Sequence, residues 1–125
     1  MTRIEITEES GADDLAPLAL AFNQIISLPV TIRSARSPGV RVEKGVIVDK
    51  SYTGPVLEKV LQSGRPERTI PGDGAFKGVP VSVAPIKVGD QVVAAVGVVD
   101  VVGTIDIPEV FGAYTEVVRQ VSQGR

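Results

Sequence analysis

The sequence contains no cysteine and no histidine among its 125 residues. Without cysteine it forms no disulfides or thiolate nucleophiles, and it cannot hold zinc or iron–sulfur centres through sulfur. Without histidine it lacks the side chain that titrates near neutral pH and most often acts as a general base. A hydrolytic triad would need lysine or a carboxylate as its base, and a metal site would need oxygen ligands alone. No motif supports either one, so we assign no catalytic residues and no metal ligands, and the cofactor stays unknown.

Two further absences concern partners. The 13 basic residues are spread over the whole chain and form no basic stripe of the kind that a phosphate backbone needs. No apolar run approaches the length of a membrane span, and the acidic start "MTRIEITEESGADD" lacks the apolar centre of a secretory signal. We therefore expect no nucleic-acid partner, no membrane insertion and a cytoplasmic protein.

The length and the composition are those of one soluble domain. A chain of 125 residues forms one sizeable core but not two. A composition of 43% hydrophobic and 22% charged residues, with a net charge of -2, is typical of a globular protein. We expect a single α+β domain over residues 1–125.

The first predicted helix lies in "GADDLAPLALAFNQIISL". Asp13 and Asp14 are placed to cap it or to interact with the positive end of its dipole, and Pro17 fits only within the first turn. Further apolar residues beside the main stripe indicate that the helix packs against two surfaces. The main apolar stripe, at helical spacing, consists of Leu15, Leu18, Ala19, Phe22, Ile25 and Ile26.

Two more helices are predicted. In "SYTGPVLEKVLQSG" the helix begins near Pro55, Ser51 or Thr53 caps it, and Gly64 ends it. We interpret "YTGP" as this helix start, and a ligand-binding loop is the alternative. The last helix is expected at residues 107–122, where apolar residues again share one face.

The remaining segments have the patterns of strands. "VTIRSA" is one strand, and a second covers residues 40–48, with a possible break at Lys44-Gly45. A short extended piece at residues 68–70 precedes a hairpin of "VPVSVAPI" and "VVAAVGVVDVVG", with Gly89-Asp90 at its turn. The long last strand is apolar on both faces, which predicts a central position with cover on both sides. The fold class that follows is α+β, with a central antiparallel sheet of about five strands and three helices.

Three motifs carry a resemblance to a known family. "YTGPVLEKVL", "FKGVPVSVAPI" and "VVAAVGVVDVVGTIDIPEVFGAY" resemble, in this order, an uncharacterised family of small proteins from methanogenic archaea. The resemblance covers the chain from about Arg41 onward and implies a methanogen source, with no established activity and no site residues to transfer. More coarsely, the order of elements is similar to GAF, PAS and profilin-like sensor modules, whose central sheet forms one wall of a small-molecule pocket.

Two aspartates follow or interrupt the most apolar run. Asp106 opens "DIPE" with Glu109 three residues later, which predicts a capping box at the start of the last helix. Asp100 lies within the apolar strand, where a carboxylate needs a cation or several backbone N–H donors. It either accepts hydrogen bonds from the turn that follows or faces a ligand, and we leave both interpretations open.

The candidate ligand-binding residues combine Asp100 with nearby cations. Our hypothesis is that Asp100 and an arginine of "IRSARSPGVR" orient a polar small molecule. The loop "PGDGAFKG" is a connector or an anion-binding turn, with Phe76 as its core anchor. The cations considered as partners are Arg33, Arg36, Arg41 and Lys77.

Three classes of function remain after these exclusions. The first is a small-molecule-binding sensory or regulatory module that forms a homodimer through its terminal helices. The second is an interaction or assembly subunit with a filled core. An enzyme that uses a carboxylate with lysine or arginine ranks last, because histidine, cysteine and catalytic motifs are absent.

Overall fold

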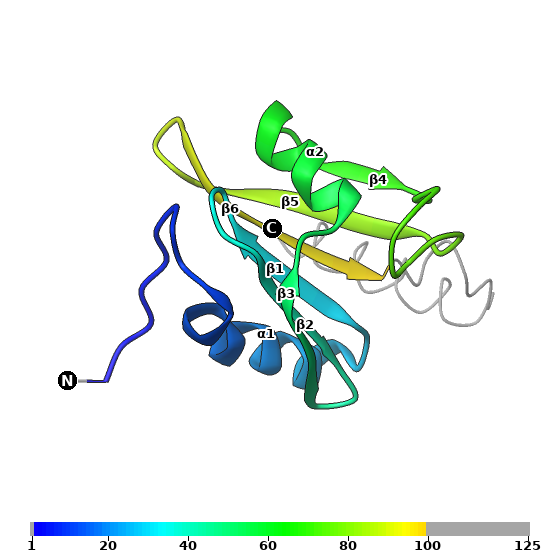
Figure 1. The fold of residues 1–125 in the computed structure, drawn as a ribbon, viewed down its shortest axis with the longest axis horizontal. Coiled ribbons are helices and arrows are strands. Elements are labelled where there is room, and N and C mark those ends of the chain that lie inside the picture. Colours follow the sequence, from blue (N-terminus) through cyan, green and yellow to red (C-terminus); the bar gives the residue numbers. More distant parts are fainter. Residues whose placement is uncertain (1, 100–125) are drawn as a thin grey trace, which may run out of the picture.

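The computed structural model describes residues 2–99 of the chain, which form two helices and six strands (Figure 1). None of the helices in this part of the chain is long and apolar enough to cross a membrane. The predicted helix at residues 107–122 lies outside the described residues. The elements are α1 (Ala12–Ile26), β1 (Val30–Ser34), β2 (Gly39–Glu43), β3 (Val46–Tyr52), α2 (Pro55–Ser63), β4 (Glu67–Thr69), β5 (Val81–Val88) and β6 (Gln91–Val99).

All six strands belong to one antiparallel sheet in the order β3-β2-β1-β6-β5-β4. The sequence predicted about five strands, and that number is wrong because residues 40–48 form a hairpin. Lys44 and Gly45 both have positive φ angles, 54° and 75°, as a two-residue hairpin turn of type I′ requires. The predicted hairpin of β5 and β6 is confirmed, with Gly89-Asp90 between the paired residues Val88 and Gln91.

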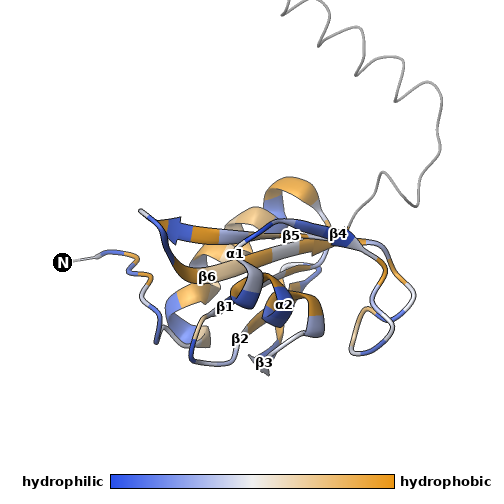
Figure 2. Ribbon diagram, turned by 90° about the horizontal axis from the view of Figure 1, so that it is seen from above, coloured by the Kyte–Doolittle hydropathy of each residue, from blue (hydrophilic) through white to orange (hydrophobic). Residues whose placement is uncertain are grey.

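Strand β6 occupies the centre of the sheet between β1 and β5, as predicted from its apolar character. Its alternate residues belong to two hydrophobic clusters, and Figure 2 shows the hydrophobic colour along this strand. Val96 and Val98 pack against the cluster that includes α1, β1 and β2. Ala95 belongs to the cluster of α2 and β5. The prediction of a central strand with apolar contacts on both faces is confirmed.

Helix α1 covers β1, β2 and β3, and the predicted apolar stripe is buried in its first half but not at its end. Leu15 and Ala19 are buried as predicted, whereas Phe22 and Ile25 are exposed. Within residues 2–99, α1 packs on one surface, the sheet, and the second surface expected for it stays a prediction.

Asn23 explains the departure at the end of the helix. Its side-chain amide donates to the Leu28 carbonyl at 2.8 Å and accepts the Gly45 N–H at 2.7 Å. These two hydrogen bonds hold the polar side chain inward, so the apolar residues beside it turn outward.

The start of α1 also differs in detail from the expectation. The N-cap is Gly11, and the Asp14 carboxylate accepts the Gly11 N–H at 3.0 Å. Asp13 and Asp14 lie in the first turn, where their charges interact favourably with the helix dipole. Pro17 lies beyond the first turn, so its expected position is wrong, and it offers no N–H to the carbonyl of Asp13.

Helix α2 begins and ends at the predicted glycine and proline signals. Pro55 is at the first position, and Gly64 adopts the left-handed conformation and donates its N–H to the Val60 carbonyl at 2.8 Å. The expected cap by Ser51 or Thr53 is wrong. The N-cap is Gly54, whose φ of 67° favours glycine.

Candidate functional site

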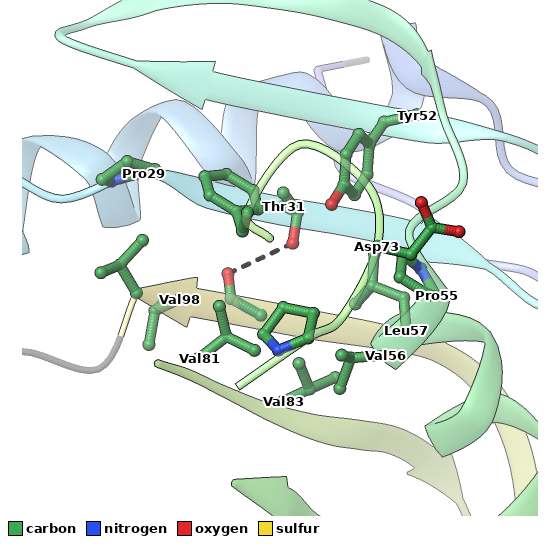
Figure 3. Close-up of a pocket in the computed structure, with 14 residues that line it drawn as sticks. Pro29, Thr31, Tyr52, Pro55, Val56, Leu57, Asp73, Val81, Val83 and Val98 are labelled. Carbon is green, nitrogen blue, oxygen red and sulfur yellow. Dashed lines mark hydrogen bonds between the residues drawn. The ribbon is translucent and has the colours of Figure 1, made fainter. Parts of the chain in front are cut away.

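An apolar hollow lies between the sheet, α2 and the loop at residues 70–80 (Figure 3). It holds about 370 Å³ of space not filled by atoms, part of it open to solvent, and about 20 Å³ admits the centre of a water molecule. Most of its wall is valine, leucine and proline, and its polar side chains are those of Thr31, Tyr52 and Asp73. The lining residues are Pro29, Thr31, Tyr52, Pro55, Val56, Leu57, Pro71, Asp73, Phe76, Val81, Val83, Gly97, Val98 and Val99.

Gly97 of β6 forms the floor of the hollow, and its missing side chain leaves the space above the strand open. A Cβ atom at this position would lie 2.9 Å from Thr31 Oγ1 and 3.0 Å from a methyl group of Val83. It would also lie 3.5 Å from Leu57, which reaches down from α2. Because three elements meet over one glycine, the hollow depends on the register of β1, β6 and β5.

Tyr52, the last residue of β3, places a hydroxyl group in this apolar space. Its side chain is 8% exposed, and its hydroxyl points into the hollow (Figure 3). Within residues 2–99 the hydroxyl has no hydrogen-bond partner. The residue as a whole is buried, but its hydroxyl oxygen still reaches solvent, because the fully buried side-chain atoms without a hydrogen-bond partner in this part of the chain are Ser34 Oγ and Arg41 Nε. A ligand with a hydrogen-bond acceptor could replace water at this hydroxyl.

Neighbouring residues fix the Tyr52 ring in this orientation. A Cβ atom at Gly54 would lie 2.6 Å from the ring and 3.0 Å from the hydroxyl, so only glycine leaves room at this place. On its other side the ring meets Phe76 edge to face, with centroids 6.3 Å apart and planes at 63°. The tyrosine is thus held between the start of α2 and the loop.

The environment of Tyr52 also determines its protonation. Burial raises the pKa of the Tyr52 hydroxyl above 10.0, and the nearby Asp49 and Glu43 carboxylates raise it further, while Arg41 opposes them. The hydroxyl is therefore neutral at physiological pH and can donate a hydrogen bond. Thr31 already uses its hydroxyl, which donates to the Gly97 carbonyl at 3.5 Å, the dashed line of Figure 3.

The loop that covers the hollow has hydrogen bonds between its own residues. The Gly78 N–H donates to the Pro71 carbonyl at 2.9 Å, and the Val79 N–H donates to the Phe76 carbonyl at 2.9 Å. Phe76 packs against the cluster of α2 and β5, as expected for a core anchor. The Arg41 guanidinium lies 5.8 Å from the centroid of the Phe76 ring, a cation–π distance.

The predicted cations are found in different surroundings. Arg41 lies beside the hollow, because its guanidinium contacts the ring of the lining residue Phe76. Its Nε is 3.1 Å from Glu43 Oε2. Lys77 is exposed in the covering loop. Arg33 is 9% exposed and donates to the backbone carbonyls of Ser34 at 3.1 Å and Thr53 at 3.4 Å.

Arg36 has a role at the surface. It forms ion pairs with Glu8 at 2.9 Å and with Glu9 at 3.4 Å. Asp100, Asp106 and Glu109 lie outside the described residues, so both interpretations of Asp100 and the predicted capping box stay predictions.

Sequence reasoning missed the polar groups of the hollow itself. Thr31 lies in the predicted strand "VTIRSA" but was not among the predicted site residues. Tyr52 stands in "SYTGP", which we interpreted as a helix start, and the helix start is confirmed. The available signal was a tyrosine two residues before Gly-Pro, where a strand ends next to a helix. The alternative interpretation of "YTGP", a ligand-binding loop, would have included Tyr52 in a site.

Titration tests the environment of Tyr52. The chain has two tyrosines, so the difference in tyrosinate absorbance between wild type and Tyr52→Phe isolates this one. We expect Tyr52 to ionise above pH 10.0 in the folded protein. Because folding raises its pKa, the stability difference between wild type and Tyr52→Phe is constant well below pH 10, and wild type loses stability relative to Tyr52→Phe as the pH rises through 10 toward the folded-state pKa. Ionisation of Tyr52 at or below pH 10 would contradict the burial of the hydroxyl.

Comparisons with known proteins identify relatives without an assigned activity. The model of an uncharacterised family conserved in archaea, DUF2111, matches residues 22–102. "Uncharacterized protein MJ0405" of Methanocaldococcus jannaschii is 47% identical over 103 residues, which are 82% of this chain and 79% of that protein. No solved structure matches the chain. The chain therefore belongs to the DUF2111 family of archaeal proteins, as the resemblance of its motifs implied.

Proposed function

We propose that this protein is a small-molecule-binding sensory or regulatory module and that the ligand lies in the hollow above Gly97. The observation that carries the proposal is the hydroxyl of the buried residue Tyr52, which has no hydrogen-bond partner within residues 2–99 and points into an apolar space. Ligand sites commonly combine apolar walls with a few polar groups that orient the bound molecule. The walls of valine, leucine and proline supply the first feature, and Tyr52 supplies the second.

The covering loop gives the ligand a way in. Only about 20 Å³ of the hollow admits the centre of a water molecule, so a ring-sized ligand needs Phe76 and Pro71 to move outward. The loop can move as a unit, because its backbone hydrogen bonds join its own residues. The contacts to be broken are the edge-to-face pair of Phe76 with Tyr52 and the cation–π contact with Arg41.

Binding is favoured over catalysis by the chemistry of the lining. Its titratable side chains are Tyr52 and Asp73. The Asp73 carboxylate lies at the rim and is directed away from the centre of the hollow (Figure 3), so these two groups do not converge on one reacting atom. The proposal includes the expected cytoplasmic location, the methanogen source and the likeness to GAF, PAS and profilin-like modules.

The binding proposal is tested with 2-phenylethanol, which combines an apolar ring with a hydroxyl. Titration followed by ¹H–¹⁵N NMR is expected to show millimolar or tighter binding, with shifts at Gly97 and Leu57. Tyr52→Phe keeps the ring and removes the hydroxyl, so we expect binding about fivefold to tenfold weaker, the effect of one hydrogen bond.

The matched control removes a hydroxyl from an exposed threonine. Thr7→Val lies in the N-terminal segment and should leave the affinity unchanged. If wild type and Tyr52→Phe bind 2-phenylethanol with equal affinity, the Tyr52 hydroxyl does not take part in binding. If 2-phenylethanol shifts no resonance around the hollow, the proposed function is wrong.

The second candidate, an interaction or assembly subunit, is favoured by the exposed end of α1. Phe22, Ile25 and Ile26 are 38%, 76% and 37% exposed on adjacent turns. Residues 15–32 include no charged side chain. A second copy could therefore pack on this surface without burying an unpaired charge. We propose a homodimer through this end of α1, and it is compatible with ligand binding on the opposite face of the sheet.

The dimer proposal predicts a mass of two chains for the full-length protein in light scattering coupled to size-exclusion chromatography. Ile25→Lys places a charge at the centre of the interface and should give monomers. The control is Val88→Lys at the β5–β6 turn. Val88 is 69% exposed, similar to Ile25 at 76%, and its replacement should leave the dimer intact. A monomeric wild type, or a dimer that persists in Ile25→Lys, would contradict this interface.

A further inference from the structure

A second, polar hollow adjoins the apolar one. It holds about 770 Å³ of space, much of it open to solvent, and lies between β3, the start of α2 and the covering loop. The two hollows share Tyr52, Pro55 and Asp73 in their linings. If a ligand enters the apolar hollow past these residues, the end of the ligand that stays nearer to solvent lies in the polar hollow.

The lining of the polar hollow carries negative charge. Asp49, Glu58 and Asp73 contribute carboxylates, and no lysine or arginine is among its lining residues. None of these three carboxylates forms an ion pair within residues 2–99. Arg41, which interacts electrostatically with Tyr52, already pairs with Glu43 at 3.1 Å.

The hydrogen bonds of the carboxylates leave acceptor capacity. Asp49 accepts the Ser51 N–H at 2.8 Å, and Asp73 accepts the Gly74 N–H at 2.8 Å, each through Oδ1. The second oxygen of each aspartate remains able to accept from a ligand. These carboxylates line the hollow without an ion pair within residues 2–99, although the Arg33 guanidinium lies behind its wall and donates to the Thr53 carbonyl at 3.4 Å.

Tyr52 is an independent sign of a ligand at the same place. It is more than nine-tenths buried, its hydroxyl lacks a partner within residues 2–99, and it lines both hollows. Its ring supplies an aromatic face, which attracts cations as well as apolar groups, whereas the ring of Phe76 already carries the Arg41 guanidinium. Acidic side chains and an aromatic ring thus surround one entrance.

We infer that the ligand is an amphipathic organic cation, with its apolar body above Gly97 and an ammonium group at the rim beside Asp73. This inference rests on the proposed function and adds the class of ligand. Carboxylate or phosphate ligands are disfavoured, because they would meet like charges at the entrance. A metal ion is not the occupant we infer, because the described residues contain no group of three or more side chains suited to hold one.

Three probes of similar shape and different charge test the inference. These are 2-phenylethylamine, 2-phenylethanol and 3-phenylpropanoate, titrated against the full chain at neutral pH and low ionic strength. We expect the amine to bind about fivefold more tightly than the alcohol and the carboxylate to bind about fivefold more weakly, because partly exposed ion pairs have modest energies. The advantage of the amine should shrink as salt is added.

Asp73→Asn keeps the shape of the side chain and removes its charge. It should reduce the preference for the amine over the alcohol by about half or more. Asp90→Asn, at the exposed β5–β6 turn, removes the same charge far from the hollow and should leave the preference unchanged.

The outcomes separate this inference from the proposed function. If the alcohol binds at the hollow and the amine binds no more tightly, the ligand class is wrong and the binding function stands. If Asp73→Asn and Asp90→Asn reduce the preference for the amine equally, the effect is one of net charge alone. The inferred position of the ammonium group beside Asp73 is then wrong. If none of the three probes binds, the proposed function fails and this inference fails with it.

Discussion

The missing side chain at Gly97 is the constraint on which the candidate site depends. Gly97 lies on the central strand, where Thr31 of β1, Val83 of β5 and Leu57 of α2 approach within 3.5 Å of the place that a Cβ would fill. A larger residue would fill the floor of the hollow and push these side chains apart. The strand order, the position of α2 and the free space under the loop are thus linked through one residue.

Tyr52 places a polar group against apolar walls, and its hydroxyl has no hydrogen-bond partner within residues 2–99. The residue is buried but its hydroxyl oxygen still reaches solvent, so a ligand could take the place of water there. Gly54 at φ 67° and the edge-to-face contact with Phe76 hold the hydroxyl in place. Three carboxylates that form no ion pair within residues 2–99 line the polar hollow beside it.

Local signals predicted most of the described fold, and tertiary contacts account for the errors. The Gly89-Asp90 turn, the Pro55 start and the Gly64 end of α2 depend on backbone conformation and are readable from neighbouring residues. Apolar spacing gave the buried residues of the first half of α1, but at its end the buried face depends on Asn23, whose amide bonds to residues 5 and 22 positions away. The site was hidden for the same reason, because Tyr52, Thr31 and Gly97 come together only through sheet register and the placement of α2.

The most direct measurement is a crystal structure of the full chain soaked with 2-phenylethanol. The account predicts density for the ring above Gly97, with the probe oxygen within hydrogen-bond distance of Tyr52 Oη and Phe76 displaced outward. A structure in which the probe is absent from this space, while the Tyr52 hydroxyl donates to a protein group, would contradict the account.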